Sequence, residues 1–265
     1  MAGFGIGQLS RAMRSARPSL LAVAAMAPVS LLALQLWSTT PSVTSPPGSS
    51  PLGLETSARA VVFLAAWMLM VAAMMLPSAM PLLVSLDRIA RNQPVRHQIP
   101  MFAALAYLGV WGLVGIAAWI TSAASEAYIL PLASTQLASG LAGACLVLAG
   151  LYGLSPLAGA CLRACRRPFG FLARYWRGES RARRQASLIG AAYGVSCVGC
   201  CVPMLGIMFV VGMTNMAIMI AMGAGMVIMK SSVIGTRVAH MLAIALIGVG
   251  VAVGVGWVPL LPHHH

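Results

Sequence analysis

Charged residues are scarce in this chain: only 8% of its 265 residues are Asp, Glu, Lys or Arg, and just four are acidic. A soluble globular domain usually has roughly 25% charged residues, so the composition excludes an ordinary soluble enzyme. The four acids fall in predicted loops or at the ends of apolar stretches, which leaves no buried carboxylate pair for acid–base catalysis. Nucleotide-binding, hydrolase-nucleophile and zinc-protease motifs are also missing. The sequence offers no catalytic residues, and we expect a role other than catalysis.

Hydrophobic residues, by contrast, make up 60% of the chain. They gather in runs close to the roughly 20 residues that cross the hydrocarbon core of a bilayer. The sequence therefore predicts an all-α protein, a polytopic transmembrane bundle of about seven helices. A tight helical hairpin is expected for the fifth and sixth spans, and the first span could instead be a cleaved signal peptide. The predicted spans are residues 19–37, 58–84, 100–121, 135–157, 187–212, 214–230 and 238–257.

Basic residues indicate the orientation of these spans, because Lys and Arg accumulate in short cytoplasmic loops. Of the 17 basic residues, 16 fall on one side of the predicted spans and only Arg59 falls on the other. The N-terminus is therefore predicted to be cytoplasmic and the C-terminus outside, in the inner (cytoplasmic) membrane of the cell. This topology also explains the net charge of +13 without nucleic-acid binding, for which the cations would have to form one groove.

The chain is predicted to form a single transmembrane domain over residues 1–265. Residues 18–57 would hold the first helix and an outside loop rich in Pro and Ser, and residues 58–257 the helical core. Within this core, the basic segment 163–186 has apolar residues at helical spacing, which is typical of a helix lying on the cytoplasmic membrane surface. The lipid bilayer is thus the first expected partner. The three terminal histidines are either native or the remains of a purification tag.

Cysteine spacing indicates a functional site. A disulfide framework is not expected, because three cysteines lie inside the fifth span and two near a cytoplasmic helix end. Spacings of three and four residues place Cys197 beside both Cys200 and Cys201 on a helix, close to the bilayer midplane. Buried cysteines can be plain packing residues, but three within five positions predict a binding site. The six cysteines are Cys145, Cys161, Cys165, Cys197, Cys200 and Cys201.

Methionine is the second unusual feature, with 18 residues. Several lie on one helical stripe in residues 219–229, a pattern that core packing alone also produces. Depth in the membrane favours Met74 and Met75 of the second span, together with Met219 and Met222 of the sixth, as neighbours of the cysteines. Thiolates and thioethers together are the soft ligands that select Cu(I), whereas zinc usually takes Cys with His. We therefore predict a Cu(I) site, with another soft metal as the alternative.

Three stretches of the sequence carry further motifs. Residues 67–77 resemble the pattern W-x-x-M-x-x-A-M-M-x-P with the first Met displaced. Residues 152–168 resemble Y-Q-x-T-P-L-K followed by C-L-x-x-C-R-x-P. Residues 194–201 resemble G-x-x-C-x-G-C-C. Together, these motifs resemble a family of bacterial and archaeal integral membrane proteins described as predicted metal-binding proteins of unknown function. The resemblance extends over about residues 67–230.

This resemblance implies that the three cysteines of residues 197–201 bind a metal, and it places Cys161 and Cys165 in a second matched motif. It implies no established activity. The missing polar residues of the family pattern shift the expected site further towards sulfur ligands, and so towards Cu(I). The chain departs from the pattern at three positions: Gly153 replaces a usual Gln, Ala158 a usual Lys, and Met229 an expected acidic residue.

Three functions fit these features. The leading interpretation is Cu(I) handling, by binding, transfer or transport, and the missing ATP motif would leave transport passive, ion-coupled or driven by a partner. The second is an accessory or assembly subunit of a membrane copper enzyme. The third is a thiol–disulfide redox conduit based on Cys197 and Cys200, although a thiol buried in hydrocarbon reacts poorly. The expected partners are a membrane copper-enzyme complex or a metallochaperone, and no nucleic acid.

Overall fold

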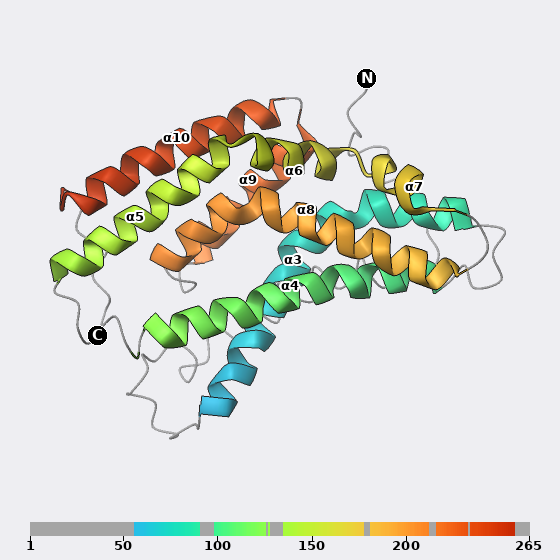
Figure 1. The fold of residues 1–265 in the computed structure, drawn as a ribbon, viewed down its shortest axis with the longest axis horizontal. Coiled ribbons are helices and arrows are strands. Elements are labelled where there is room, and N and C mark those ends of the chain that lie inside the picture. Colours follow the sequence, from blue (N-terminus) through green and yellow to red (C-terminus); the bar gives the residue numbers. More distant parts are fainter. Residues whose placement is uncertain are drawn as a thin grey trace. The chain divides into compact units, whose positions relative to one another are not determined.

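The computed structural model describes residues 56–90, 98–125, 127, 135–177, 181–211, 216–232 and 234–257. These residues form helices and no strand, which confirms the predicted all-α class for this part of the chain (Figure 1). The predicted span 19–37 and the loop that follows it lie outside the described residues. The helices are α3 (Thr56–Ile89), α4 (Ile99–Ala124), α5 (Thr135–Leu154), α6 (Pro156–Arg166), α7 (Phe169–Tyr175), α8 (Ala182–Val211), α9 (Met216–Ser231) and α10 (Gly235–Gly254).

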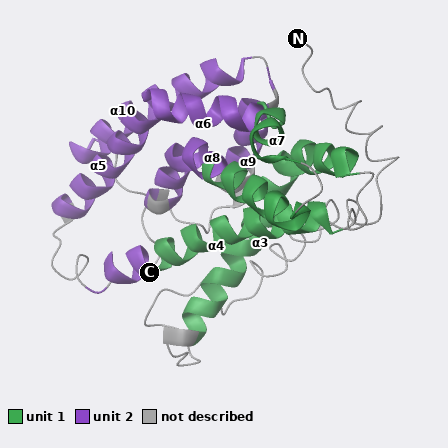
Figure 2. Ribbon diagram, turned by 45° about the vertical axis from the view of Figure 1, so that its right-hand side comes forward, with its two compact units in different colours: residues 1–119, 167–195 green, residues 120–166, 196–265 purple. Residues whose placement is uncertain are grey.

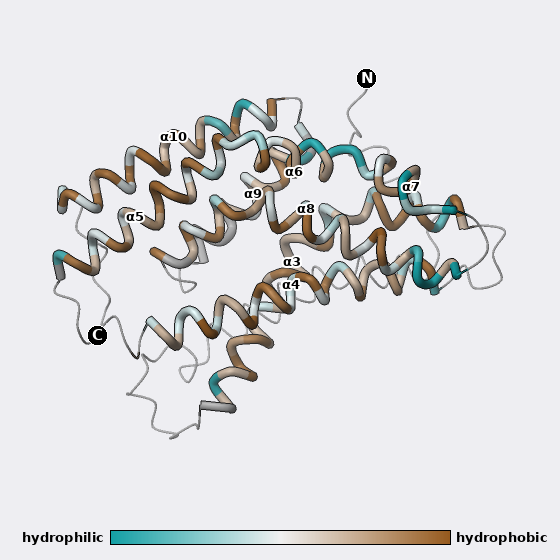
Figure 3. Tube along the Cα trace, viewed as in Figure 1, coloured by the Kyte–Doolittle hydropathy of each residue, from teal (hydrophilic) through white to brown (hydrophobic). Residues whose placement is uncertain are grey.

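Five of these helices are long and apolar enough to cross a membrane, namely α3, α4, α5, α8 and α10. They expose large apolar side chains such as Leu113, Leu148 and Met241, as expected where lipid tails are the solvent. Hydrophilic residues concentrate instead around α6 and α7 (Figure 3). The chain is therefore a membrane protein. The predicted sixth span corresponds to α9, whose 16 residues extend over about 24 Å, less than the roughly 30 Å of a hydrocarbon core.

The chain divides into two compact units, which Figure 2 shows in different colours. Unit 1 contains α3, most of α4, α7 and the first part of α8, up to Val195. In this unit the indole nitrogen of Trp67 donates a hydrogen bond to the carbonyl oxygen of Trp111 over 3.0 Å. Gly115 leaves room for that indole, because a Cβ at this position would lie 2.6 Å from the Trp67 ring. The tryptophan of the first motif is thus a packing residue of unit 1.

Two prolines, Pro77 and Pro81, lie inside α3 of unit 1. Tyrosines from the neighbouring helices support this stretch of backbone, where a proline removes a helical hydrogen bond. The hydroxyl of Tyr107 donates to the carbonyl oxygen of Met75 over 3.3 Å, and that of Tyr193 donates to the carbonyl oxygen of Ser78 over 3.1 Å. Further along α3, Asp87 lies in the last turn of the helix, at the span end where the sequence placed it, and it is buried there.

Unit 2 contains α5, α6, the second part of α8, α9 and α10. Here α5 and α10 pack closely along glycines: a Cβ at Gly143 would lie 2.5 Å from the carbonyl oxygen of Gly250 and 2.7 Å from the nitrogen of Gly254. At the other end of α5, a Cβ at Gly153 would lie 2.9 Å from the Cβ of Ala243. The two helices are therefore antiparallel, and small residues bring their backbones together.

Replacing Gly143 by alanine is expected to lower the thermal midpoint of the detergent-solubilised protein by at least about 3 °C, because the added methyl group has no space between α5 and α10. Gly140→Ala is the matched control on the same helix, since a Cβ there would meet nothing within 4 Å. Alanine also favours a helix over glycine, so the control variant should be unchanged or slightly more stable. Equal midpoints for the two variants would contradict the glycine packing.

The helix is interrupted at Ser155, between α5 and α6, whereas the predicted span continued to residue 157. The Ser155 hydroxyl oxygen accepts a hydrogen bond from the backbone nitrogen of Ala158 over 3.2 Å, and Pro156 occupies the first helical position. Serine as the capping residue and proline directly after it are a favoured start for a helix. A second proline, Pro168, separates α6 from α7. The basic segment 163–186 is consequently divided among α6, α7 and the start of α8.

Candidate metal centre

Three cysteines of unit 2 form the centre of the site. The sulfur atoms of Cys165, Cys197 and Cys200 all lie within 4.8 Å of one another. Cys165 comes from α6, and the other two come from α8, where a spacing of three residues places them on one helical face. Cys165 and Cys197 are buried, whereas Cys200 is half-buried. We call these three residues the cysteine cluster.

Further sulfur atoms adjoin the cysteine cluster. The sulfur of Cys201 lies 3.9 Å from that of Cys200 and 3.9 Å from the Sδ atom of Met226 on α9. Both Cys201 and Met226 are buried. Cys161, one turn before Cys165 on α6, places its sulfur against Gly199, where a Cβ would lie only 2.6 Å from it. Gly199 thus leaves the space that the Cys161 thiol occupies.

A positive charge lies beside this group of sulfur atoms. The ammonium group of Lys230, in the last turn of α9, donates a hydrogen bond to the Cys197 sulfur over 3.0 Å. A cation in contact with sulfur stabilises negative charge there, which is the charge that a metal-binding thiolate carries. The sequence placed Lys230 among the basic loop residues of the cytoplasmic side. Its side chain is half-buried, and its ammonium group reaches the cysteine cluster.

Helices α8 and α9 run antiparallel, as three contacts along their length show. Cys197 meets Lys230, Cys201 meets Met226, and Met204 lies 3.5 Å from the position of a Cβ at Gly225. Since positions 226 and 230 are four residues apart on α9, they share the face of the helix that contacts α8. This register decides which methionine of α9 reaches the cysteines.

An arginine ties α6 to the end of α9. The guanidinium of Arg166 donates a hydrogen bond to the carbonyl oxygen of Ser232 over 2.6 Å. Carbonyl groups at a helix C-terminus lack partners within the helix, and a basic side chain satisfies them and favours the negative end of the helix dipole. The contact holds α6, with its two cysteines, against the helix that carries Lys230 and Met226.

The two thiols of α6 lie outside the apolar spans, and both have a raised pKa. Burial raises the pKa of Cys161, and the nearby Cys200 adds to the effect. Hydrogen bonds to Cys197 and Cys200 raise the pKa of Cys165, and burial raises it further. A thiol with a raised pKa keeps its proton at neutral pH until a metal displaces it. Metal affinity at these thiols should therefore rise as the pH increases.

The structure brings together all five cysteines that the sequence singled out, and it leaves the four predicted methionines untested. Met74 and Met75 are half-buried residues of α3 in unit 1, whereas the cysteine cluster belongs to unit 2. Met219 lies on α9, but its side chain is outside the described part, and Met222 is half-buried one turn before Met226. Their participation stays a prediction. Met226, which the sequence reasoning left out of the site, makes the described contact with Cys201.

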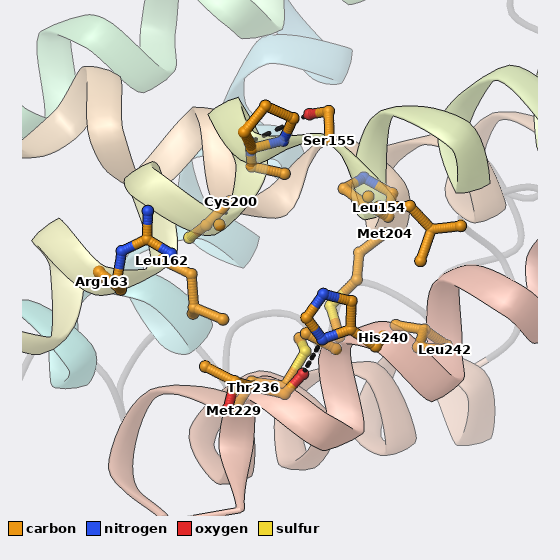
Figure 4. A pocket seen from close by; sticks show the side chains of 16 residues that line it. Leu154, Ser155, Leu162, Arg163, Cys200, Met204, Met229, Thr236, His240 and Leu242 are labelled. Atoms are coloured by element: carbon orange, nitrogen blue, oxygen red, sulfur yellow. Dashed lines mark hydrogen bonds between the residues drawn. The ribbon is translucent and has the colours of Figure 1, made fainter.

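A pocket of about 140 Å³ opens beside Cys200 within unit 2 (Figure 4). The end of α5, the start of α6, and parts of α8, α9 and α10 enclose it. Besides Cys200, its lining includes Arg163, Met204, Met229 and His240. Cys200 is thus the member of the cysteine cluster that faces the pocket.

The chemistry of the site is that of a soft metal ion. Within the described residues, the group with metal-binding geometry consists of cysteines alone, and the adjoining ligand atom of Met226 is also sulfur. Thiolates and thioethers favour Cu(I), while carboxylates or water would suit hard cations. The residues present therefore fit a Cu(I) ion.

The comparison with protein families agrees with this chemistry. Residues 64–253 match a family described as PpoB2: Copper chaperone. This range contains α6, α8 and α9, the helices that supply the cysteine cluster and its neighbours. No curated protein and no solved structure gave a match.

Proposed function

Because this chain belongs to the PpoB2 copper chaperone family, we propose that it binds Cu(I) at the cysteine cluster and passes the ion to a copper-dependent protein at the membrane. The observation that carries this proposal is the grouping of three sulfur atoms within 4.8 Å, supplied by two helices of one unit. Chaperones must release what they bind. Ligands on separate helices, α6 and α8, allow the site to open without unfolding either helix.

Cys165, Cys197 and Cys200 are the proposed primary ligands. Cys161, Cys201 and Met226 adjoin them and offer alternative sulfur ligands during exchange. Exchange between neighbouring sulfur atoms needs no change in the oxidation state of Cu(I). Met74, Met75, Met219 and Met222 remain candidate ligands, as the sequence predicted.

The proposed topology keeps the seven predicted spans, with α9 as a short sixth span, the N-terminus in the cytoplasm and the C-terminus outside. Two observations within unit 2 support it: α5 and α10 are antiparallel, and so are α8 and α9. In this arrangement α9 must return the chain to the side from which α10 starts. The basic residues Arg163, Arg166 and Lys230 lie at that side, which the distribution of Lys and Arg assigns to the cytoplasm.

Copper content measured by elemental analysis tests the proposed function. Protein purified anaerobically in detergent with Cu(I), and with the terminal histidines replaced by alanine, should hold close to stoichiometric copper. The combined variant Cys165→Ser, Cys197→Ser and Cys200→Ser should lose it, because hydroxyl oxygen is a poor ligand for a soft ion. Cys145→Ser is the control, since this cysteine is exposed on α5. Unchanged copper in the combined variant would contradict the site. If neither the unmodified chain nor the combined variant held copper, and the thiols could be alkylated only after reduction, the result would favour the redox alternative.

A further inference from the structure

We propose that the pocket beside Cys200 is a second Cu(I) site, which receives the ion before it moves to the cysteine cluster. The inference rests on the proposed function and adds the route by which Cu(I) reaches the cysteine cluster. We call the pocket the receiving site, and its ligand atoms are the Nε2 of His240 and the Sδ atoms of Met204 and Met229. All three side chains line one pocket of about 140 Å³ together with Cys200 (Figure 4).

The orientation of the His240 ring suits it to bind a metal ion. Its Nδ1 atom lies 2.8 Å from the carbonyl oxygen of Thr236, one turn earlier on α10. A carbonyl oxygen only accepts hydrogen bonds, so Nδ1 carries a proton, and Nε2 is the ring nitrogen that is left to bind a metal. A hydrogen bond from the second ring nitrogen to a backbone carbonyl is the usual support of a metal-binding histidine.

The two methionines of the receiving site supply soft ligand atoms at the pocket. Met204 and Met229 are both buried in the protein, yet both border the pocket. Thioethers bind Cu(I) without a charge, and so does a neutral imidazole. The receiving site therefore holds the ion with neutral ligands. The cysteine cluster, once deprotonated, offers anionic ones. This difference in charge favours movement of the cation from the pocket towards the cysteines.

Cys200 connects the two sites. It lines the pocket, and its sulfur lies 3.8 Å from the sulfur of Cys165 and 3.9 Å from that of Cys201. In the transfer, a bond forms between copper and the Cys200 sulfur, and the bonds to Nε2 and the thioethers break. The thiol proton leaves to water, and copper remains Cu(I), so that no electron is exchanged.

The charge at the pocket indicates the form in which copper arrives. Arg163 is exposed and also lines the pocket, where its positive charge attracts an incoming anion. A Cu(I) ion held by two thiolates of a carrier has a net charge of −1, and an arginine attracts such a complex. The receiving site therefore suits copper delivered as an anionic thiolate complex.

The rate of copper uptake tests the receiving site. Stopped-flow absorbance would follow Cu(I) leaving its coloured bicinchoninate complex for the protein, with the terminal histidines replaced by alanine in every sample. With one equivalent of Cu(I), the double variant His240→Ala and Met229→Leu should slow uptake by about tenfold or more, while the intact cysteine cluster still takes up the ion in the end. Met241→Leu is the matched control, because this methionine is 70% exposed beside His240. An unchanged uptake rate in the double variant would overturn the inference.

A second measurement isolates the receiving site from the cysteine cluster. With Cys165, Cys197 and Cys200 replaced by serine, the chain should still bind Cu(I) while an excess of the ion is present, although too weakly to keep it through purification. Its copper X-ray absorption spectrum should show an imidazole nitrogen with sulfur, and His240→Ala should remove the imidazole signal. A spectrum without an imidazole, or no binding, would overturn the inference. Failure of the proposed function is a different result, namely no copper in the unmodified chain.

Discussion

Serine in place of Cys197 should lower the affinity for Cu(I) by more than about a hundredfold. Loss of a residue that only supports a metal ligand typically costs 10–100-fold, so loss of a ligand at the centre of the site should cost at least as much. Cys197 is fully buried and lies within 4.8 Å of the sulfur atoms of both Cys165 and Cys200. It also accepts the hydrogen bond of Lys230. A serine hydroxyl in the same place would be a harder and weaker ligand.

Competition against bicinchoninate, monitored by absorbance, would measure this affinity. Cys145→Ser should leave it unchanged, because Cys145 lies exposed on α5 outside the group of sulfur atoms. If Cys197→Ser and Cys145→Ser had the same affinity as the unmodified chain, Cys197 would not be a ligand. The thermal midpoint of each variant shows whether the fold is intact, since a serine hydroxyl buried without a partner also destabilises a protein.

Removing the charge of Lys230 is expected to weaken Cu(I) binding by about 10–100-fold. A Cu(I) ion held by the three thiolates of the cysteine cluster would have a net charge of −2, and a buried net charge is costly unless an opposite charge offsets it. The ammonium group lies 3.0 Å from the Cys197 sulfur, where it supplies that charge. Lys230→Met keeps the apolar stem of the side chain and removes only the charge. Affinity for Zn(II) should fall less, because a divalent ion at the same three thiolates leaves one negative charge fewer to offset.

Affinities for both ions, measured by competition, test the role of Lys230. Lys230→Arg should restore most of the Cu(I) affinity, since it restores the positive charge. Arg237→Met removes a charge from the exposed start of α10 and is the control. Should Lys230→Met bind Cu(I) as tightly as this control, the lysine would have no part in holding the metal. An equal loss for the two ions would indicate a purely structural effect.

The long helices were the most predictable part of the molecule. An apolar run of about 20 residues has few alternatives to a membrane-spanning helix, and α3, α4, α5, α8 and α10 all follow from such runs. Ends of helices depend on single residues instead. The hydropathy of residues 135–157 is continuous, but Ser155 and Pro156 start a new helix within it. The dipeptide Ser-Pro was the available signal, and hydropathy alone could not weigh it.

The cysteines of the site were predictable because their spacing is local. Residues three or four apart on a helix are neighbours whatever the rest of the chain does, and this brought Cys197, Cys200 and Cys201 together. Met226 and Lys230 depend on the register between α8 and α9, which a single sequence does not reveal. The stripe of methionines on α9 and a lysine one turn beyond Met226 were present as signals. Only the contact between Cys201 and Met226 shows which methionine of α9 lies at the site.

The interruption at Ser155 separates α6 from α5, so that α6 could rotate without moving α5. Since α6 has its own cap, it can swing as a rigid body about one residue while α5 stays packed against the glycines of α10. Such a swing would carry Cys161 and Cys165 away from α8 together and leave Cys197 and Cys200 in place. It would have to break the hydrogen bond from Arg166 to Ser232 and to separate the sulfur atoms of Cys165 and Cys200. Rotation of α6 about Ser155 would therefore open and close the metal site.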